Sequence, residues 1–297
     1  MNLAGVAIDD TFAEAFGMRA TRLVITAETA EWARIAATSL TGFATSVIGC
    51  GVEAGIEREL APADTPDGRP GIAVLLFAVS RDALAKAVRD RVGQCVLTST
   101  GAACYAGLAG DAQVPLGRAL RYFGDGHQSA KRIGEQRYWR IPVMYGEFVC
   151  EDMAGVQSAV GGGNFIMLGR SRAGVLAAAE RAVAAMRRVP EVIMPFPGGL
   201  VPSGSKVGSR YKFLPASTND AFCPTIKGAV DTALEPDIVS VVEIVIDGLS
   251  EAAVGAAMAA GIRAACADAA GALTRITAGN YGGKLGPFHF HLRELLR

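Results

Sequence analysis

The chain has 297 residues, 51% of them hydrophobic, and its 29 basic side chains balance 29 acidic ones. This length and composition predict one large or two medium domains with ample apolar material for packed cores. The balanced charge argues against a nucleic-acid binder. No uncharged run reaches the roughly 20 apolar residues that a membrane-spanning helix needs.

The cysteines and the N-terminus indicate the compartment. Six cysteines are scattered along the chain without a Cys-x-x-Cys motif, which is typical of free thiols in a reducing environment. The N-terminus carries Asp9 and Asp10 instead of a basic flank before an apolar core, so it does not resemble a secretory signal. We therefore expect a cytoplasmic protein.

Four units of strand, helix and strand follow one another along the chain. The strands are rich in β-branched and apolar residues, and the helices are rich in Ala with apolar residues at spacings of three and four. The predicted strand, helix and strand of each unit are residues 22–27, 30–40 and 44–50; 72–78, 81–93 and 95–99; 164–168, 173–188 and 191–195; and 239–246, 250–267 and 273–278.

Two consecutive units of this kind form a ferredoxin-like sandwich, in which helices cover one face of an antiparallel sheet. The sequence therefore predicts an α+β protein of two ferredoxin-like α/β-sandwich lobes, each built from two βαβ units. We place the boundary near Cys150, with an N-terminal lobe of residues 1–150 and a C-terminal lobe of residues 151–297. Residues 137–143 and 147–149 are predicted to add hairpin strands.

Residues 195–224 form a long segment, rich in Pro and Gly, with no helical or strand period. Compact domains rarely keep irregular connections of this length, and those they keep are usually functional. Its polar side chains indicate the wall of a binding site for a large polar ligand; the alternative is a surface loop that joins two units. The residues predicted to bind substrate here are Gly198, Gly199, Ser205, Lys206, Ser209, Arg210, Tyr211, Ser217, Thr218, Asn219 and Asp220.

Glu243 interrupts the otherwise apolar strand predicted over residues 239–246. A carboxyl group among β-branched neighbours is partly desolvated, which raises its pKa and suits it to proton transfer near neutral pH. The alternative is that this strand face is exposed and that Glu243 is solvated. The pattern alone favours the solvated carboxylate.

Two glycine-rich segments, residues 161–164 and 279–284, offer further candidates for ligand contacts in Asn164, Asn280 and Lys284. Neither segment has the form of a dinucleotide-binding or phosphate-binding loop, and ordinary turns are the alternative. His289 and His291 alternate on a predicted strand, but without a third ligand we predict no metal site. Cys223 has no nearby histidine and is expected to be a packed thiol.

Eleven sequence blocks resemble the formylmethanofuran:tetrahydromethanopterin formyltransferase family, and they run in order along the whole chain. The blocks are DDTFAEAF at 9–16, TGFATSVI at 41–48, TPDGRPG at 65–71, GQC at 93–95, YFGDG at 122–126, GGNF at 162–165, PFPGG at 195–199, SKVGS at 205–209, FLPASTNDAFCP at 213–224, EIVIDGL at 243–249 and AGNYGGKLG at 278–286.

This resemblance implies formyl transfer between the amine of methanofuran, or a related furan amine, and N5 of tetrahydromethanopterin. It implies no tightly bound cofactor, with both compounds acting as co-substrates. The family pattern assigns the acid-base carboxyl to Glu243, which reverses the preference drawn from the pattern alone. The resemblance also implies a homotetramer, a proximal-type N-terminal lobe and a distal-type C-terminal lobe.

The composition is more typical of the mesophilic bacterial branch, in which the enzyme is a subunit of a formyltransferase/hydrolase complex in one-carbon oxidation. Two other interpretations remain open. The chain could be a non-catalytic ligand-binding or scaffold subunit of such a complex, because fold alone does not establish catalysis. A weaker alternative is a cysteine amidohydrolase that uses Cys223.

Overall fold

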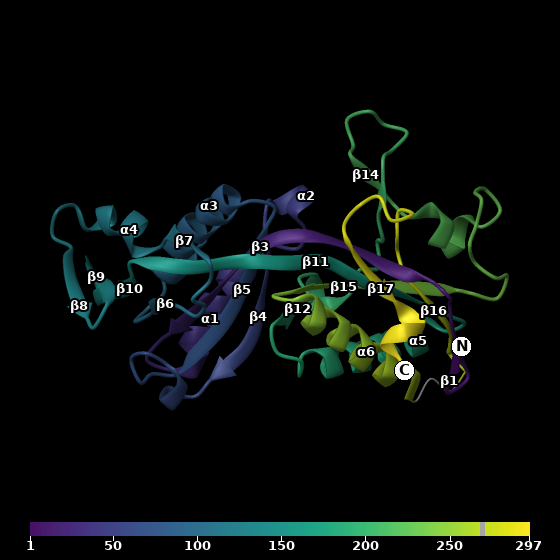
Figure 1. Cartoon of the computed structure of the whole chain (residues 1–297), viewed down its shortest axis with the longest axis horizontal. Helices are drawn as coiled ribbons and strands as arrows, with labels where there is room; N and C mark the ends of the chain where they lie inside the picture. The colour runs from purple at the N-terminus through teal and green to yellow at the C-terminus, as the bar shows by residue number, and fades with distance from the viewer. Residues whose placement is uncertain (268–270) are drawn as a thin grey trace. The chain divides into compact units, whose positions relative to one another are not determined.

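The computed structural model describes residues 1–267 and 271–297, which form two compact units (Figure 1). Unit 1 contains residues 1–16, 161–247 and 251–297, and unit 2 contains residues 17–160 and 248–250. The chain passes between the units inside two long strands, β3 (Phe12–Thr26) and β11 (Met153–Gly169). The predicted boundary after residue 150 is therefore replaced by crossing points at residues 16–17 and 160–161, and residues 248–250 return briefly to unit 2.

Unit 2 is a ferredoxin-like sandwich. Its elements are β3, α1 (Ala30–Thr41), β4 (Glu53–Leu60), β5 (Gly71–Ala78), α3 (Arg81–Arg91) and β6 (Ala103–Ala106), and its sheet has the antiparallel order β4-β5-β3-β6. Apolar residues of β3 and β5 are buried against the Ala-rich face of α1. The Ser80 side chain accepts a hydrogen bond from the Ala83 N–H at 3.2 Å, which caps the start of α3.

Hairpins extend the sheet of unit 2. The strand β10 (Gly146–Glu151) pairs in parallel with β6 and antiparallel with β9 (Gln136–Val143), which pairs with β8 (Ser129–Ile133). The first residues of β11 pair with β7 (Ala112–Pro115). The predicted strands at residues 137–143 and 147–149 are confirmed.

Unit 1 repeats the ferredoxin-like order. It contains the second part of β11, α5 (Arg172–Met186), β12 (Val192–Ile193), β15 (Ser240–Gly248), α6 (Glu251–Ala267) and β16 (Leu273–Thr277), with the strand order β12-β15-β11-β16. The sheet continues through β2 (Val6–Ile8) and β1 (Asn2–Leu3), while β17 (Phe288–His291) pairs with the start of β3 and leads into α7 (Leu292–Leu295). The predicted fold of two ferredoxin-like lobes is confirmed.

Two predicted strands are wrong. Residues 44–50 contain the short helix α2 (Val47–Cys50), because the Ser46 side chain caps it by accepting from the Ile48 N–H at 3.3 Å; the strand comes later, as β4. Residues 95–99 lie beyond α3, which continues into a π-helical turn at Val92–Val96 before β6 begins.

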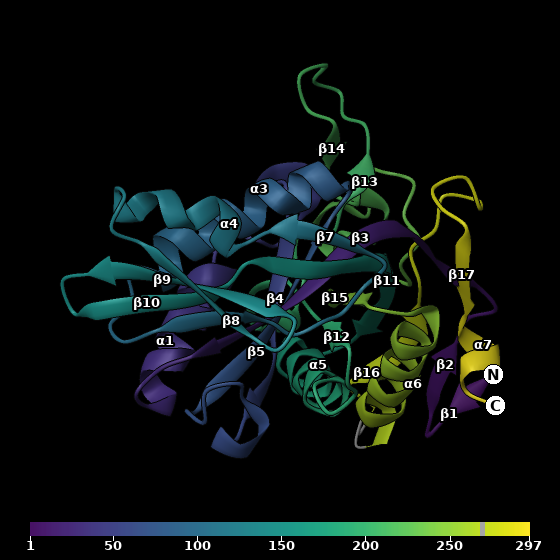
Figure 2. The same ribbon diagram turned by 60° about the vertical axis from the view of Figure 1, so that its left-hand side comes forward.

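The irregular segment after β12 covers the face of the unit 1 sheet opposite to α5 and α6. Ile166 and Val241 of the sheet pack there with Phe222, Leu234 and Ile238. The segment also forms a small hairpin, β13 (Lys206–Val207) with β14 (Ala216–Ser217), whose connecting residues project beyond the rest of the unit (Figures 1 and 2). No helix within residues 1–267 and 271–297 is long and apolar enough to cross a membrane.

Candidate active site

Glu243 lies near the middle of β15, on the sheet face that the irregular segment covers. Its backbone exchanges two hydrogen bonds with Val201, from the Val201 N–H at 2.8 Å and from its own N–H at 3.2 Å. The neighbouring Ile244 and Ile246 point to the opposite, helix-covered face and are fully buried. The strand alternation therefore places the carboxyl group between the sheet and the covering segment.

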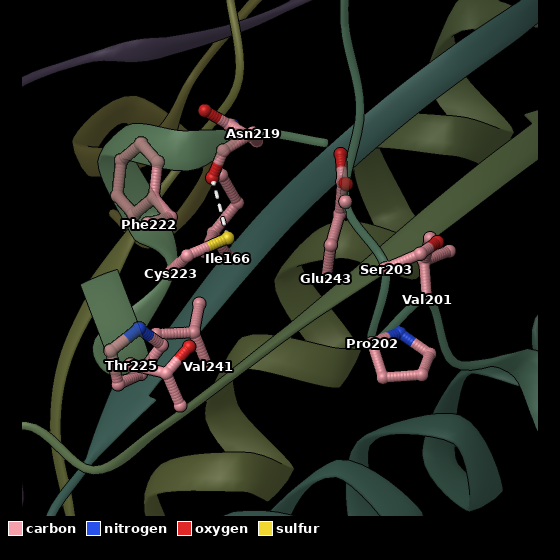
Figure 3. A pocket seen from close by; sticks show the side chains of 12 residues that line it. Ile166, Val201, Pro202, Ser203, Asn219, Phe222, Cys223, Thr225, Val241 and Glu243 are labelled. Atoms are coloured by element: carbon pink, nitrogen blue, oxygen red, sulfur yellow. Dashed lines mark hydrogen bonds between the residues drawn. The ribbon is translucent and has the colours of Figure 1, made fainter. Parts of the chain in front are cut away.

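A cavity of about 230 Å³ opens beside this carboxyl group. Figure 3 shows Asn219, Phe222 and Cys223 on one side of Glu243 and Ser203 on the other. The lining residues are Ile166, Val201, Pro202, Ser203, Gly204, Asn219, Phe222, Cys223, Pro224, Thr225, Val241 and Glu243. Glu243 is half-buried at this cavity wall, so the structure favours the partly desolvated carboxyl group over the solvated one.

The surroundings of Glu243 change its acidity. Desolvation by burial raises the pKa of the Glu243 carboxyl from an ordinary value of 4.5 to about 7. A group with this pKa holds a proton about half of the time at neutral pH, so it can both donate and accept one. The site can therefore support a reaction in which a proton moves between two heteroatoms.

Hydrogen bonds between its own residues hold the segment that faces Glu243. The Cys223 thiol donates to the Asn219 carbonyl at 3.3 Å, and the Thr218 hydroxyl donates to the Ser203 carbonyl at 3.2 Å. Gly204 has a φ of +56°, and a Cβ there would lie 3.2 Å from the Asn219 Cβ. The two walls of the cavity are therefore joined to each other, and Gly204 permits their close approach.

Of the residues predicted to bind substrate, Asn219 lines the cavity together with Glu243. Lys206 and Asp220, both predicted to contact ligands, pair with each other at 2.6 Å. Their hydrogen bond is the main cause that lowers the pKa of the Asp220 carboxyl.

The remaining predicted residues of the long segment lie outside the cavity lining. Ser217 donates to the Gly208 carbonyl at 2.7 Å, and Ser209 accepts from the Tyr211 N–H at 3.0 Å, so both help to shape the hairpin. The others are either exposed on the segment or adopt backbone angles that shape it: Gly198, Gly199, Ser205, Arg210 and Tyr211.

The predicted glycine turn at residues 161–164 lies inside the strand β11, where Gly162 has a φ of +85°. Asn164 is buried, and its amide donates to the carbonyls of Gly162 and Gly279 and accepts from the Gly279 N–H. Asn280 donates to the Thr11 hydroxyl at 3.2 Å and to the Phe12 carbonyl at 3.1 Å. Both amides therefore hold the 279–286 loop, whereas Lys284 lies exposed on it.

Sequence reasoning did not single out Phe222 and Thr225 as lining residues, or Tyr281 as a group whose acidity Glu243 affects. Burial raises the pKa of the Tyr281 hydroxyl, and the negative charges of Glu243 and Glu14 raise it further. The block AGNYGGKLG drew attention to the loop, but no sequence signal separated Tyr281 from its neighbours.

Family comparisons match both halves of the chain. The sequence model described as formylmethanofuran-tetrahydromethanopterin formyltransferase matches residues 1–143, and the model described as FTR, proximal lobe, matches residues 146–295. A protein of Methylococcus capsulatus named formylmethanofuran--tetrahydromethanopterin formyltransferase is 64% identical over 297 residues, which cover 100% of both chains. The chain belongs to this formyltransferase family.

Other formyltransferase relatives agree over the full length. A protein of Methylorubrum extorquens, named as a subunit of a formyltransferase/hydrolase complex, is 54% identical over 301 residues, covering 99% of this chain and 97% of that protein. A crystal structure of the formyltransferase/hydrolase complex of the same organism, with methylofuran, contains a chain that matches with a TM-score of 0.97 and 54% identity, covering 100% of this chain and 99% of that one.

The formyltransferase of Methanosarcina barkeri matches in structure with a TM-score of 0.93 and 46% identity, covering 99% of this chain and 100% of that one. The family description gives the term proximal lobe to residues 146–295. The predicted label, which placed the proximal lobe at the N-terminus, is therefore wrong.

Proposed function

We propose that this protein transfers a formyl group between formylmethanofuran, or a related furan amine, and N5 of tetrahydromethanopterin. Membership of the formyltransferase family supports this activity. The observation that carries the chemistry is Glu243, a carboxyl group with a pKa of about 7 at the wall of a cavity. A transfer between two nitrogen atoms requires a group of this kind, because the attacking nitrogen loses a proton and the departing one gains one.

The reaction proceeds by direct transfer in a ternary complex. The N5 lone pair of the pterin attacks the formyl carbon, a new N–C bond forms, and the carbonyl oxygen becomes the oxyanion of a tetrahedral intermediate. The N–C bond to the furan amine then breaks as the oxyanion returns to a carbonyl. Glu243 takes the proton of N5 and delivers it to the departing amine, so no net proton is consumed.

Holding both substrates in reacting geometry supplies much of the rate in such a mechanism. Asn219 is the predicted substrate ligand nearest to Glu243, because both line the same cavity. The exposed Arg210 and Lys284 suit the anionic tails of the substrates, and Lys206 becomes available to them when it exchanges Asp220 for a substrate group. Asn164 and Asn280 act by holding the 279–286 loop.

The transfer uses both compounds as co-substrates and needs no tightly bound cofactor. We expect a cytoplasmic homotetramer in one-carbon metabolism. A formyltransferase/hydrolase complex is the expected partner assembly, since the relative in Methylorubrum extorquens is named as a subunit of such a complex.

Replacing Glu243 with Gln tests the proposal. The amide keeps the shape of the side chain but cannot carry the proton, so kcat should fall by about 10²–10⁴. The measurement is the rate of formyl transfer by the purified chain alone, with Asp237→Asn as a matched control on the exposed surface. Transfer by the wild-type chain without partner subunits would also dismiss the scaffold alternative. A variant that turns over at the wild-type rate would remove Glu243 from the mechanism.

A further inference from the structure

A second carboxyl group, that of Glu14 at the start of β3, is enclosed in unit 1. The residue is only 2% exposed. One carboxylate oxygen accepts the backbone N–H groups of Tyr281 at 2.7 Å and Gly283 at 3.1 Å. The other accepts the N–H groups of Leu285 and, at 3.0 Å, Gly286. A single side chain therefore binds four backbone donors of one loop.

These four bonds require a carboxylate. Burial alone raises the pKa of Glu14, but the backbone N–H groups outweigh it and hold the pKa below its ordinary value, so the group is ionised. An ionised carboxylate offers only acceptors, whereas an amide would turn an N–H₂ group towards two of the backbone donors. Glutamine has nearly the same shape as glutamate, yet it cannot satisfy this loop.

The same short stretch of chain holds the loop at a second point. The Asn280 amide donates to the Thr11 hydroxyl and to the Phe12 carbonyl, and the Glu14 N–H donates to the Gly279 carbonyl at 3.1 Å. Residues 11–14 therefore fix the loop from residue 279 to residue 286. We call residues 279–286 the strap.

The strap is joined to the candidate active site through Asn164. The Asn164 amide accepts the Gly279 N–H at 2.6 Å, and Asn164 lies on β11 two residues before Ile166, which lines the cavity with Glu243. A change in the strap backbone therefore acts on the part of β11 that forms the cavity wall. Lys284, on the same strap, is exposed to solvent.

We propose that Glu14 is a positioning residue for formyl transfer: its carboxylate fixes the strap, and the strap is bonded through Asn164 to the strand β11, which lines the cavity with Glu243. This inference rests on the proposed function. It assigns to the block DDTFAEAF a role in the reaction although Glu14, enclosed by the strap, does not line the cavity.

Limited proteolysis tests the hold on the strap without measuring activity. Trypsin cleaves after Lys284 only when the strap can leave its fixed conformation, so Glu14→Gln should speed cleavage between Lys284 and Leu285 by about tenfold or more. Cleavage after Lys212, in the exposed hairpin, is the internal standard and should not change. Glu53→Gln is the matched control, because Glu53 is also buried and accepts a backbone N–H, from Val47 at 2.9 Å, in unit 2.

Kinetics test the effect on the reaction. Displacement of a reacting group by about 1 Å can reduce the rate by about 10², so we expect Glu14→Gln to lower kcat by about 10–100-fold. KM should rise by a smaller factor than kcat falls, because Lys284 is the proposed substrate contact that the strap itself carries. Glu53→Gln should change neither quantity. A rise in KM with normal kcat, or wild-type cleavage at Lys284, would overturn the proposal.

If Glu14→Gln does not fold, Glu14→Asp tests the proposal in its place. Aspartate keeps the charge but is one methylene shorter, so it should give a folded protein with intermediate cleavage and intermediate kcat. Wild-type values in this variant would refute the role of Glu14. If the wild-type chain itself transfers no formyl group, the proposed function fails, while the cleavage rates still report whether Glu14 holds the strap.

Discussion

A carboxyl group that gives up contact with water on folding makes stability depend on pH. The pKa of Glu243 is about 7 in the folded protein against an ordinary 4.5, so the folded state binds the proton more tightly than the unfolded state. The contribution of Glu243 to stability is therefore complete below pH 4.5 and is lost as the pH rises through 7. The shift corresponds to a loss on the order of 3 kcal/mol.

Comparison of the wild type with Glu243→Gln isolates this effect from the other titrating groups. The difference in free energy of unfolding, variant minus wild type, should increase between pH 5 and pH 8, because glutamine carries no charge at either pH. Urea denaturation at a series of pH values provides the measurement. Two parallel stability curves would show that Glu243 is not desolvated.

Cys223 lies at the cavity wall, but its surroundings are those of a structural thiol. The thiol donates to the Asn219 carbonyl, and no histidine lines the cavity among the residues that the structure describes. Since a serine hydroxyl can make the same hydrogen bond, Cys223→Ser should keep transfer activity within about fivefold of wild type. Complete loss of transfer, with the fold intact by circular dichroism, would restore the cysteine mechanism.

At the scale of elements, the long strand β11 depends on one glycine. Gly162 has a φ of +85°, and a Cβ at this position would lie 2.9 Å from the Phe16 ring. Its N–H donates to the Asp247 carboxylate at 3.1 Å. Gly162→Ala should therefore destabilise the protein by about 1–3 kcal/mol, the usual range for a residue forced into a rare backbone conformation.

Gly17→Ala is the matched control in β3, because a Cβ there meets nothing within 4 Å and its backbone is extended. Thermal unfolding of both variants gives the comparison. Equal melting temperatures would show that β11 tolerates a side chain at residue 162.

The elements predicted correctly from the sequence are those whose signals are local. The helices α1 and α3 follow the spacing of their apolar residues, and β5 follows a continuous apolar run. The strand predicted at residues 44–50 failed because the cap at Ser46 outweighs the β-propensity of the residues after it. The full lengths of β3 and β11 were missed because Gly, Ala and charged residues interrupt their patterns.

The candidate site, like the fold, could be predicted from the sequence only where the signal is local. The pattern around Glu243 indicated a carboxyl in an apolar strand, but its desolvation depends on a segment that returns across the sheet at Val201. Glu14 could not be found from its neighbours in the sequence, because its partners are backbone groups about 270 residues later in the chain. Family resemblance identified Glu243; only the fold relates it to Glu14.

At the scale of the whole molecule, the exposed hairpin bears on the proposed tetramer. Val207, Tyr211 and Phe213 are 67%, 63% and 80% exposed, and exposed apolar groups of this kind mark contact surfaces. Sedimentation equilibrium of the purified protein should give four times the chain mass of 30.8 kDa. A monomer at micromolar concentration would contradict the tetramer. In that case Phe213→Ser should leave the measured molecular mass unchanged.

The passage of the chain between its two units also determines how the protein can be divided. Residues 1–16 belong to unit 1 with β1, β2, Glu14 and the start of β3, although the rest of that unit begins at residue 161. A fragment of residues 161–297 therefore lacks the strands β1 and β2 of its sheet. It also lacks Glu14, whose carboxylate binds the strap. The first 16 residues act towards that fragment as a peptide ligand would, so a chain divided at residue 160 would need to carry them on its second part.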